Sequence, residues 1–365
     1  MPSTTNKITN FEGQRFYIGI DVHKKSWTVT IRSMHLELGH FSQLPNAEPL
    51  ARYLHSHFPG GRFLSAYEAG FCGTSPHHSL CNSGIQNIII HPADLPQSDK
   101  QKNNKTDLHD SRAIARYLEG GMLSGIHIMP RDQQERRGLY RCRQSKVVDV
   151  TRSSNRIRSL LYYAGVELPE RFKEKEYINK NFIDWLNKLK LSTLQGTQVL
   201  QHYLEDLIYQ RKQLLTITQK LKTAIAAHYK ESYTSLLTVP GIGPITATAL
   251  LAETGDLSRF KDPDQYCSYL GLVPSEQSSG TTIYTNRLQP RCNTHLRPLL
   301  IEAAWTSIRR CPVLLLYYKK HAGKNSKHAI IKVARKLALI AKGVAINKTV
   351  YQADYIQLKN PIVTN

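Results

Sequence analysis

The first 125 residues contain short apolar segments that end abruptly, which constrains this part of the chain to a sheet with helices. Four such segments predict strands, at residues 16–20, 27–31, 63–67 and 85–90. The first ends at Asp21 and the third at Glu68. Residues 107–118 instead place apolar side chains at helical spacing, with Thr106 as the expected N-cap. Strands that alternate with helices predict an α/β domain.

From about residue 130 the pattern changes to long helices. Residues 131–158 hold nine Lys and Arg against three Asp and Glu. Further along, a 3-4 spacing of apolar residues extends over about three heptads, at Leu204, Leu207, Leu214, Leu221 and Ile225. The spacing predicts a helical hairpin or a coiled-coil pair, although one amphipathic helix packed on its own domain would show the same periodicity.

A third pattern begins near residue 236. Gly241, Gly243 and Pro244 predict a tight turn ahead of an apolar helix that reaches Gly255. Such a turn exposes backbone N–H groups at a helix N-terminus, where a phosphate can bind. We therefore interpret it as a helix-hairpin-helix-like grip on a nucleic-acid backbone, although glycine and proline are also ordinary residues at helix starts.

The chain is strongly basic. It has 49 Lys and Arg against 28 Asp and Glu, a formal net charge of +21. Residues 287–348 alone hold fourteen basic residues and one acid, Glu302. A metabolic enzyme has no need of this excess, which repels itself unless a polyanion screens it, so nucleic acid is the predicted partner.

Composition excludes other classes of protein. No apolar run approaches the roughly 20 residues that a membrane helix needs, and we expect no signal peptide in the polar N-terminus. The six cysteines form no cluster at zinc spacing and are expected to be reduced thiols. A cytoplasmic protein without membrane contact is therefore expected.

Four acids fall at structurally special places. Asp21 and Glu68 follow strands, and open α/β folds place their sites at strand ends. Asp107 and Asp110 are three residues apart at a helix start and so share one face. Gathered together, these carboxylates would need cations, and two Mg²⁺ ions held this way can clamp both oxygens of a phosphodiester displacement. Taken singly, each acid could equally be a capping or surface residue.

Four sequence segments carry a family resemblance. They are YIGIDVHKK (17–25), YEAGFCG (67–73), NKTDLHDSRAIARYL (104–118) and VPGIGPITATALLAETGDLSRFKDPDQYCSYLGLVPSEQSSG (239–280). The chain resembles the transposases of the insertion sequence 110 family. The resemblance implies a RuvC-like domain of ribonuclease H fold, with a Mg²⁺-binding DEDD set at Asp21, Glu68, Asp107 and Asp110. It also implies a mostly α-helical C-terminal transposase domain in which Ser279 is the nucleophile.

The resemblance divides the chain into four expected parts. They are a RuvC-like catalytic domain (1–125), a basic helical or coiled-coil region (126–235), a serine-containing transposase domain (236–348) and a C-terminal tail (349–365). The region after Ser279 departs from the family pattern, since Gln289 and Pro290 stand where Ser-Lys often occurs and Cys292 stands near an expected glycine. Ser278 directly precedes Ser279, so the register alone leaves either serine as the nucleophile.

The family resemblance implies a site-specific DNA recombinase. Serine attack would link the protein to a DNA end, and the strands would exchange without an external energy source. A non-coding RNA encoded by the element would pair with donor and target DNA, while the protein reads backbone shape. The family assembles as dimers that pair into tetramers, for which the heptads at 204–225 would be the natural contact, and a nucleoid-associated location is expected.

Basic residues in several segments are expected to contact DNA or RNA, together with Gly241 and Gly243. Tyr140, Tyr162 and Tyr163 lie in or beside the first basic segment, where their rings could stack on unpaired bases. The expected phosphate contacts are Lys24, Lys105, Arg136, Arg137, Arg141, Arg143, Lys146, Arg152, Arg156, Arg158, Arg287, Arg297, Lys332, Arg335 and Lys336.

Three other functions remain open at this level. The same acids could support a RuvC-like, Mg²⁺-dependent endonuclease that uses water and leaves Ser279 idle. The IGID segment also opens the fold of sugar kinases and actin-like ATPases, but the phosphate-binding glycine motifs and later acids of that fold are missing. A non-catalytic nucleic-acid-binding protein would carry the acids without using them.

Overall fold

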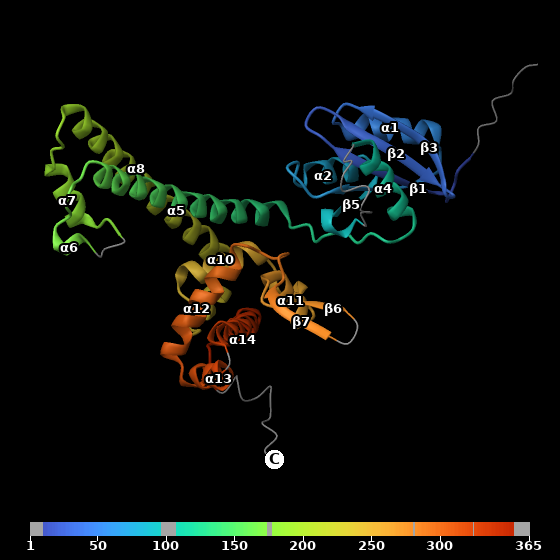
Figure 1. Ribbon diagram of the computed structural model, residues 1–365. Coiled ribbons are helices and arrows are strands. Elements are labelled where there is room, and N and C mark those ends of the chain that lie inside the picture. Colours follow the sequence, from blue (N-terminus) through green and yellow to red (C-terminus); the bar gives the residue numbers. More distant parts are fainter. Residues whose placement is uncertain (1–9, 96–106, 174–176, 280–281, 324, 354–365) are drawn as a thin grey trace, which may run out of the picture. The chain divides into compact units, whose positions relative to one another are not determined.

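The computed structural model describes residues 10–95, 107–173, 177–279, 282–323 and 325–353, and for residues 107–110 and 275–287 it describes the backbone alone. The chain divides after Ile128 into two compact units (Figure 1). Each unit has its own hydrophobic core.

The first unit is built on a five-stranded sheet with the order β3-β2-β1-β4-β5. Its strands are β1 (Arg15–Val22), β2 (Trp27–Ser33), β3 (Leu36–Gln43), β4 (Arg62–Glu68) and β5 (Gln86–Ile90). The pairs β1–β2 and β2–β3 are antiparallel, whereas β4 runs parallel to both β1 and β5. A mixed sheet with helices confirms the α/β prediction, and all four predicted strands are present. The sequence missed β3, because its first residues are polar or exposed at the sheet edge.

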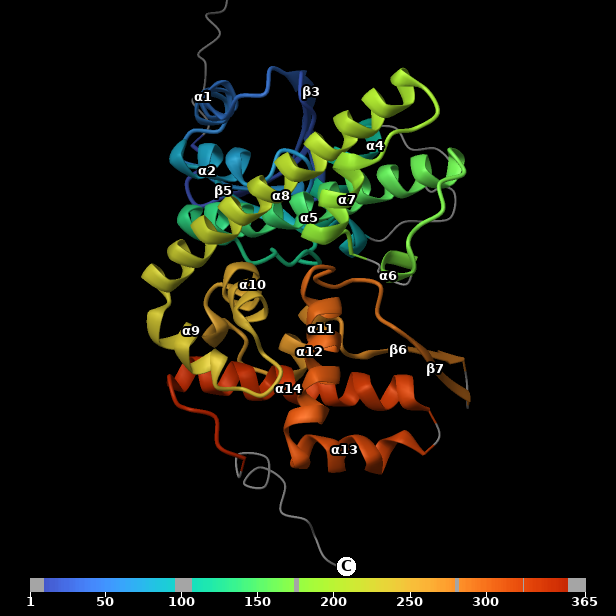
Figure 2. The ribbon, with the colours of Figure 1, turned by 90° about the vertical axis from the view of Figure 1, so that its left-hand side faces the viewer.

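Helices cover both faces of this sheet (Figures 1 and 2). Helices α1 (Ala47–His57) and α2 (Ser75–Asn82) bury their apolar sides against one face, and the short η1 (Pro92–Asp94) follows β5. Helix α4 (Asp107–Glu119), which confirms the predicted helix, packs its Ile114 and Leu118 against the other face. The expected N-cap Thr106 lies outside the described residues.

Helix α4 approaches β1 closely because position 19 is a glycine. A Cβ atom on Gly19 would lie 2.5 Å from the backbone nitrogen of Ala115 and closer still to the carbonyl oxygen of Ser111. Next to this contact, the buried hydroxyls of Thr30 and Ser111 lie 2.9 Å apart. At the other end of the helix, the guanidinium of Arg32 donates to the carboxylate of Glu119 at 2.8 Å.

These two contacts fix the direction of α4. Thr30 lies opposite Gly19 in the sheet, whereas Arg32 lies opposite Tyr17, near the beginning of β1. The helix therefore starts toward the end of β1 and finishes toward its beginning, antiparallel to the strand.

The second unit is helical apart from one two-stranded hairpin within the described residues. Its longest helices, α5 and α8, pack along each other as a hairpin. The elements are α5 (Arg131–Tyr163), α6 (Glu170–Lys173), α7 (Lys180–Lys188), α8 (Leu194–His228), α9 (Lys230–Leu237), α10 (Pro244–Thr254), η2 (Leu257–Arg259), α11 (Pro263–Leu270), β6 (Pro274–Ser279), β7 (Thr282–Leu288), α12 (Leu296–Arg310), α13 (Pro312–Ala322) and α14 (Ser326–Asn347).

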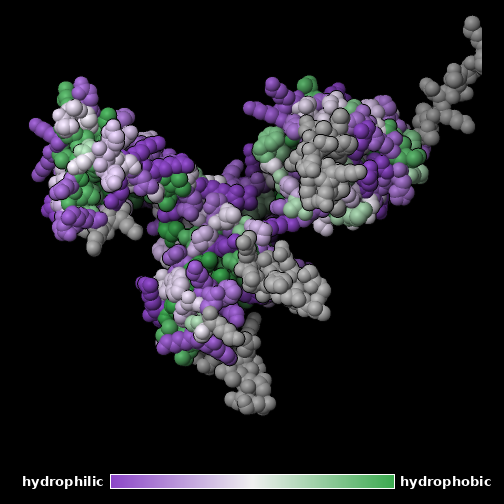
Figure 3. All heavy atoms as spheres, in the orientation of Figure 1, coloured by the Kyte–Doolittle hydropathy of each residue, from purple (hydrophilic) through white to green (hydrophobic). Residues whose placement is uncertain are grey.

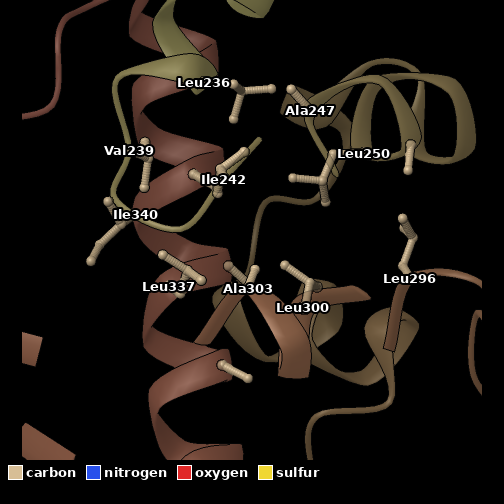
Figure 4. Close-up of a cluster of buried hydrophobic side chains, with 14 of the residues drawn as sticks. Leu236, Val239, Ile242, Ala247, Leu250, Leu296, Leu300, Ala303, Leu337 and Ile340 are labelled. Atoms are coloured by element: carbon tan, nitrogen blue, oxygen red, sulfur yellow. The ribbon is translucent and has the colours of Figure 1, made fainter. Parts of the chain in front are cut away.

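The core of the second unit gathers around α10, α12 and α14. Figure 4 shows Leu250 of α10, Leu300 of α12 and Leu337 of α14 among its apolar side chains. Both α12 and α14 are amphipathic helices that turn their small and branched residues inward. Asn325 begins α14 by accepting hydrogen bonds from the backbone N–H groups of Lys327 and His328.

Four of the five heptad residues of α8 are buried within the chain, and Leu214 is half-buried. Leu204 and Leu207 share a cluster with Ile157 of α5, and Ile225 shares another with Tyr140 of α5. The prediction of a helical hairpin is therefore confirmed. The expectation that these heptads form a dimer contact is wrong for the buried positions, because their side chains are already covered by the same chain.

No helix in the described ranges is both long and apolar enough to cross a bilayer. All six cysteines are free.

The contact at Gly19 predicts that a single methyl group will weaken the first unit. In Gly19→Ala the new Cβ meets two backbone atoms of α4 that cannot move without displacing the helix, so we expect the free energy of unfolding to fall by about 1–3 kcal/mol. Urea denaturation of the two proteins measures the difference.

Gly39→Ala in β3 is the matched control, because the nearest atom to a Cβ there is Ile31 Cδ1 at an ordinary 3.7 Å. Equal stability of the Gly19 variant and the unmodified chain would contradict the close approach of α4.

Candidate active site and nucleic-acid interface

Asp21 and Glu68 lie at the C-terminal ends of the neighbouring strands β1 and β4, on the same face of the sheet. In the parallel pair β1–β4, Ile20 is paired with Tyr67, so the next residues along the two strands, Asp21 and Glu68, are neighbours. Successive strand residues face opposite sides, and both Ile20 and Tyr67 are buried in the core under α1 and α2. Asp21 and Glu68 therefore take the face that α4 covers.

The start of α4 lies at those same strand ends. Ser111 contacts β1 at Gly19, and the helix runs antiparallel to the strand. Asp107 begins the helix about 6 Å before Ser111 along its axis, and Asp21 lies about 7 Å beyond Gly19 along the strand. The backbone thus brings the first turn of α4, which carries Asp107 and Asp110, level with Asp21.

The donor set at these strand ends suits a hard cation. Asp21 and Glu68 contribute carboxylate oxygens, which are the ligands that Mg²⁺ prefers. His23 Nε2 lies 3.1 Å from Asp21 Oδ2. A cation at Asp21 would have to share this carboxylate with His23 or displace the imidazole. Among the described side chains no three His, Cys, Asp or Glu gather around one point, and the side chains of Asp107 and Asp110 fall outside that description.

The second unit carries Ser279 at the end of β6. The hairpin pairs Ser278 with Ile283 and Ser279 with Thr282. Ser278 and Ser279 are successive residues of β6, for which the structure describes the backbone alone.

Several of the predicted basic residues of α5 are engaged within the chain. Arg141 forms a bidentate ion pair with the fully buried Glu253, with Nε–Oε1 and Nη2–Oε2 distances of 2.9 and 3.0 Å. This hydrogen-bonded pair raises the pKa of Arg141. Burial lowers the pKa of Arg137 and of Arg143, whose guanidinium groups are half enclosed by the protein.

Three other predicted basic residues of α5 are paired with an acid or partly buried. Arg136 Nη2 lies 2.6 Å from Asp132 Oδ2, and Lys146 Nζ lies 3.0 Å from Asp149 Oδ2. Arg158 is half-buried. Their roles in nucleic-acid binding stay predictions.

Two exposed arginines of α5 line a pocket between α5 and α8. Arg152 and Arg156 are 67% and 58% exposed and stand one helical turn apart. The pocket has a volume of about 500 Å³. Figure 3 shows mainly hydrophilic residues along the middle of α5. The pocket is lined by Arg152, Asn155, Arg156, Ser159, Leu160, Tyr163 and Tyr203.

The three tyrosines singled out in the sequence differ in exposure. Tyr162 and Tyr163 are each 90% exposed, so their rings are free to stack on a planar ligand. Tyr140 is fully buried in the core of the second unit. The prediction that Tyr140 could stack on a base is therefore wrong, because its ring already packs among apolar side chains.

The two glycines of the turn before α10 differ in their surroundings. Gly241 packs closely against α12, whereas the space beside Gly243 is open. Gly241 has φ = +88°, and a Cβ there would lie 2.9 Å from the backbone nitrogen of Ser307 in α12. Gly243 is the N-cap of α10, without a side-chain hydrogen bond, and a Cβ there would meet nothing within 4 Å. The predicted turn and helix are present.

Of the predicted basic residues in α14, two contact other residues of the chain and a third is exposed. Arg335 forms an ion pair with Asp264, and Lys336 Nζ lies 5.0 Å from the centre of the Tyr317 ring. Lys332 is exposed on the same helix.

Four predicted basic residues lie elsewhere. Lys24 is exposed in the turn between β1 and β2, and Arg297 is half-buried at the base of the β6–β7 hairpin. Lys105 lies outside the described residues, and Arg287 is described only by its backbone.

Sequence reasoning missed Glu253. It is the only acid within the apolar segment LLAET of α10, and an isolated acid in a buried helix is itself a signal, because such a charge needs a partner. Besides Arg141, its carboxylate accepts a hydrogen bond from Asn293 Nδ2 at 2.9 Å.

Two family models match this chain. The model described as "Transposase IS116/IS110/IS902 family" matches residues 233–319, and a second model, for the DEDD transposase domain of the IS110 type, matches residues 18–164. The second match includes Asp21, Glu68 and the whole of α4. The chain belongs to the IS110/IS116/IS902 family of transposases.

Curated transposases are similar to it along much of their length. A putative transposase of Sinorhizobium fredii, y4qE, is 27% identical over 66% of this chain and 57% of its own length. A second from that bacterium, y4rJ, is 28% identical over 74% of each chain. The transposase for insertion sequence element IS1111A of Coxiella burnetii is 26% identical over 65% of this chain and 64% of its own. The matched part thus spans less than two thirds of several of these relatives.

The exposed arginines of the α5 pocket predict a measurable phosphate contact. We expect Arg152→Gln and Arg156→Gln each to weaken binding of a fluorescent single-stranded RNA, and each to reduce the slope of log K against log salt concentration by about 1. Fluorescence anisotropy between low and physiological salt measures both quantities.

Arg131→Gln is the control, because this arginine of α5 is 89% exposed but lies outside the pocket lining. An equal loss in all three variants would indicate a general effect of net charge and contradict a contact at the pocket.

Proposed function

We propose that this chain is a DNA transposase that cuts and rejoins strands with a DEDD carboxylate set and a serine nucleophile. The observation that carries the proposal is the convergence of the ends of β1 and β4 and the start of α4 at one sheet edge, on one face. The strand order, with three antiparallel strands followed by two parallel ones, supports a RuvC-like ribonuclease H fold for this unit.

Asp21 and Glu68, with Asp107 and Asp110 from the first turn of α4, are the proposed ligands of Mg²⁺. When bound, Mg²⁺ would polarise the phosphodiester and favour ionisation of an attacking hydroxyl. The carboxylates would supply its oxygen ligands and hold it where β1 and β4 end. His23, hydrogen-bonded to Asp21, restrains the orientation of that carboxylate.

Ser279 is the proposed nucleophile. Its Oγ would form a new ester bond to the DNA phosphorus while the bond from phosphorus to the deoxyribose oxygen breaks. The serine hydroxyl gives up its proton, and the departing oxygen takes one up. Because one phosphate ester replaces another, the reverse attack by a DNA hydroxyl can rejoin the strand without an energy source.

A guide RNA and an assembly of dimers into a tetramer complete the proposal. The net charge of +21 and the exposed arginines of α5 support contact with a polyanion. A dimer contact would have to use residues other than the buried heptad positions of α8. The division of residues 126–348 into a helical region (126–235) and a transposase domain (236–348) is part of the same proposal.

The serine mechanism predicts a covalent protein–DNA adduct. Purified protein incubated with Mg²⁺, the element's DNA ends and the RNA transcribed beside the gene should yield an adduct that survives denaturing electrophoresis. Ser279→Ala should abolish it, whereas Ser278→Ala, at the adjacent residue of β6, should retain it. Asp21→Asn and Glu68→Gln should lower the rate by about 100-fold or more while DNA binding stays intact.

Three results would contradict the proposal in different ways. Cleavage without any adduct, unaffected by Ser279→Ala, would indicate a nuclease that uses water. Loss of the adduct in Ser278→Ala alone would move the nucleophile by one residue. Full recombination by the Asp21 and Glu68 variants would remove the carboxylates from the chemistry.

A further inference from the structure

The β6–β7 hairpin is held to the second unit through its base. Its two strands form a sheet of their own, and the return strand leaves it at Gln289. There the backbone N–H of Gln289 donates to the carbonyl oxygen of Val273, 3.2 Å away, just before β6. The position of the whole hairpin, including Ser279, therefore depends on what fixes these few residues.

Arg297 of α12 lies across this base. Its Nη2 donates to the carbonyl oxygen of Gln289. A Cβ on Gly271 would lie 2.6 Å from Arg297 Nε and closer still to Nη2. Gly271 ends α11 with φ = +69°, so the guanidinium rests on a backbone that only glycine leaves bare.

The Arg297 side chain is half-buried at this base. Its Nε is buried and has no hydrogen-bond partner among the described residues. A buried donor left unpaired costs free energy, so the group is held there by its other contacts. A cation committed to the hairpin base in this way is poorly placed to project toward a DNA phosphate.

The side chain of Gln289 adds a second tie. Ser268 of α11 donates through its Oγ to Gln289 Oε1 at 3.2 Å. Gln289 thus uses its amide oxygen, its backbone N–H and its carbonyl oxygen at this one junction. The residue that departs from the family pattern therefore has a definite contact role in this chain.

A third tie follows four residues later. Asn293 Nδ2 donates to Glu253 Oε2 at 2.9 Å, and Asn293 N donates to the carbonyl oxygen of Tyr269 at 2.8 Å. Asn293 Oδ1 accepts from the backbone N–H groups of His295 and Leu296 at the start of α12. The segment between β7 and α12 is therefore fixed before Arg297 itself is reached.

We propose that Arg297 is a positioning residue that clamps the base of the β6–β7 hairpin onto Gly271, and so sets the place of Ser279, rather than a ligand of a DNA phosphate. The role assigned to Ser279 rests on the proposed function. The clamp does not, because it concerns the order of the hairpin alone. Gly271 is required for the same contact, since any side chain there would displace the Arg297 guanidinium.

Hydrogen exchange measured by mass spectrometry tests the clamp without requiring activity. In Arg297→Lys and Arg297→Gln we expect peptides covering residues 273–289 to exchange about tenfold faster, with the rest of the chain unchanged. Arg310→Gln is the matched control, because this arginine lies exposed at the far end of the same helix. Unchanged exchange in the hairpin of both Arg297 variants would overturn the clamp.

The lysine variant separates a clamp from a phosphate contact. Lysine keeps the charge but lacks the planar fork that reaches Gln289 across Gly271. With the clamp, Arg297→Lys lowers the adduct rate at saturating DNA by about 100-fold, and the dissociation constant for DNA stays within about twofold. Retained rate in Arg297→Lys, with affinity lost in Arg297→Gln, would show a phosphate ligand and overturn the proposal.

Two further results complete the test. If Gly271→Ala folds, it should reproduce the exchange pattern of Arg297→Gln, and the double variant should be no worse than Gly271→Ala alone, since both changes break one contact. Independent, additive effects would contradict the clamp. Faster hairpin exchange in a protein whose unmodified form never yields an adduct would uphold the clamp and reject the serine mechanism.

Discussion

The absence of a side chain at Gly19 lets two secondary-structure elements meet with their backbones nearly in contact, and the arrangement of the acids depends on it. A larger residue would lift α4 away from β1 and separate its first turn from the strand ends. The buried Thr30–Ser111 hydrogen bond and the Arg32–Glu119 ion pair then hold the helix in one direction. Two acids far apart in the sequence and the start of one helix consequently lie at a single edge.

In the second unit a buried charge plays the corresponding part. Glu253 is fully buried, and burial of an unpaired carboxylate would be strongly unfavourable. Arg141 and Asn293 satisfy it, so the carboxylate joins α5, α10 and the segment after the hairpin. The Glu253 carboxylate, although its burial in an apolar helix is unfavourable by itself, thereby specifies how three separate parts of the chain meet.

Much of the first unit could be predicted because β1, β4 and β5 are apolar runs that end at an acid or just before a proline. Asp21 and Glu68 could be placed at strand ends from this pattern, but their neighbouring positions follow from the parallel register of β1 and β4, which periodicity does not reveal. Strand β3 escaped prediction because an edge strand with exposed residues lacks the apolar signal.

The basic residues were harder to interpret. Composition counts Arg141, Arg152 and Arg335 alike, yet the first binds the buried Glu253, the last binds Asp264, and the largely exposed Arg152 lies 3.9 Å from Asp149. Whether an arginine forms an ion pair within the protein depends on which acid the fold brings close to it. Glu253 lies 112 residues away from Arg141 in the chain. Spacing alone could not distinguish the two kinds of cation.

Helix α5 is one continuous rod of 33 residues that carries two unlike features. Arg141, which grips Glu253, and Arg152, which lines the surface pocket, are separated by about 17 Å of unbroken helix. Because the helix is unbroken, a displacement of α5 at the pocket would also move Arg141 and its ion pair with Glu253. Asn293 binds the same carboxylate, so such a movement would reach the segment that follows the hairpin.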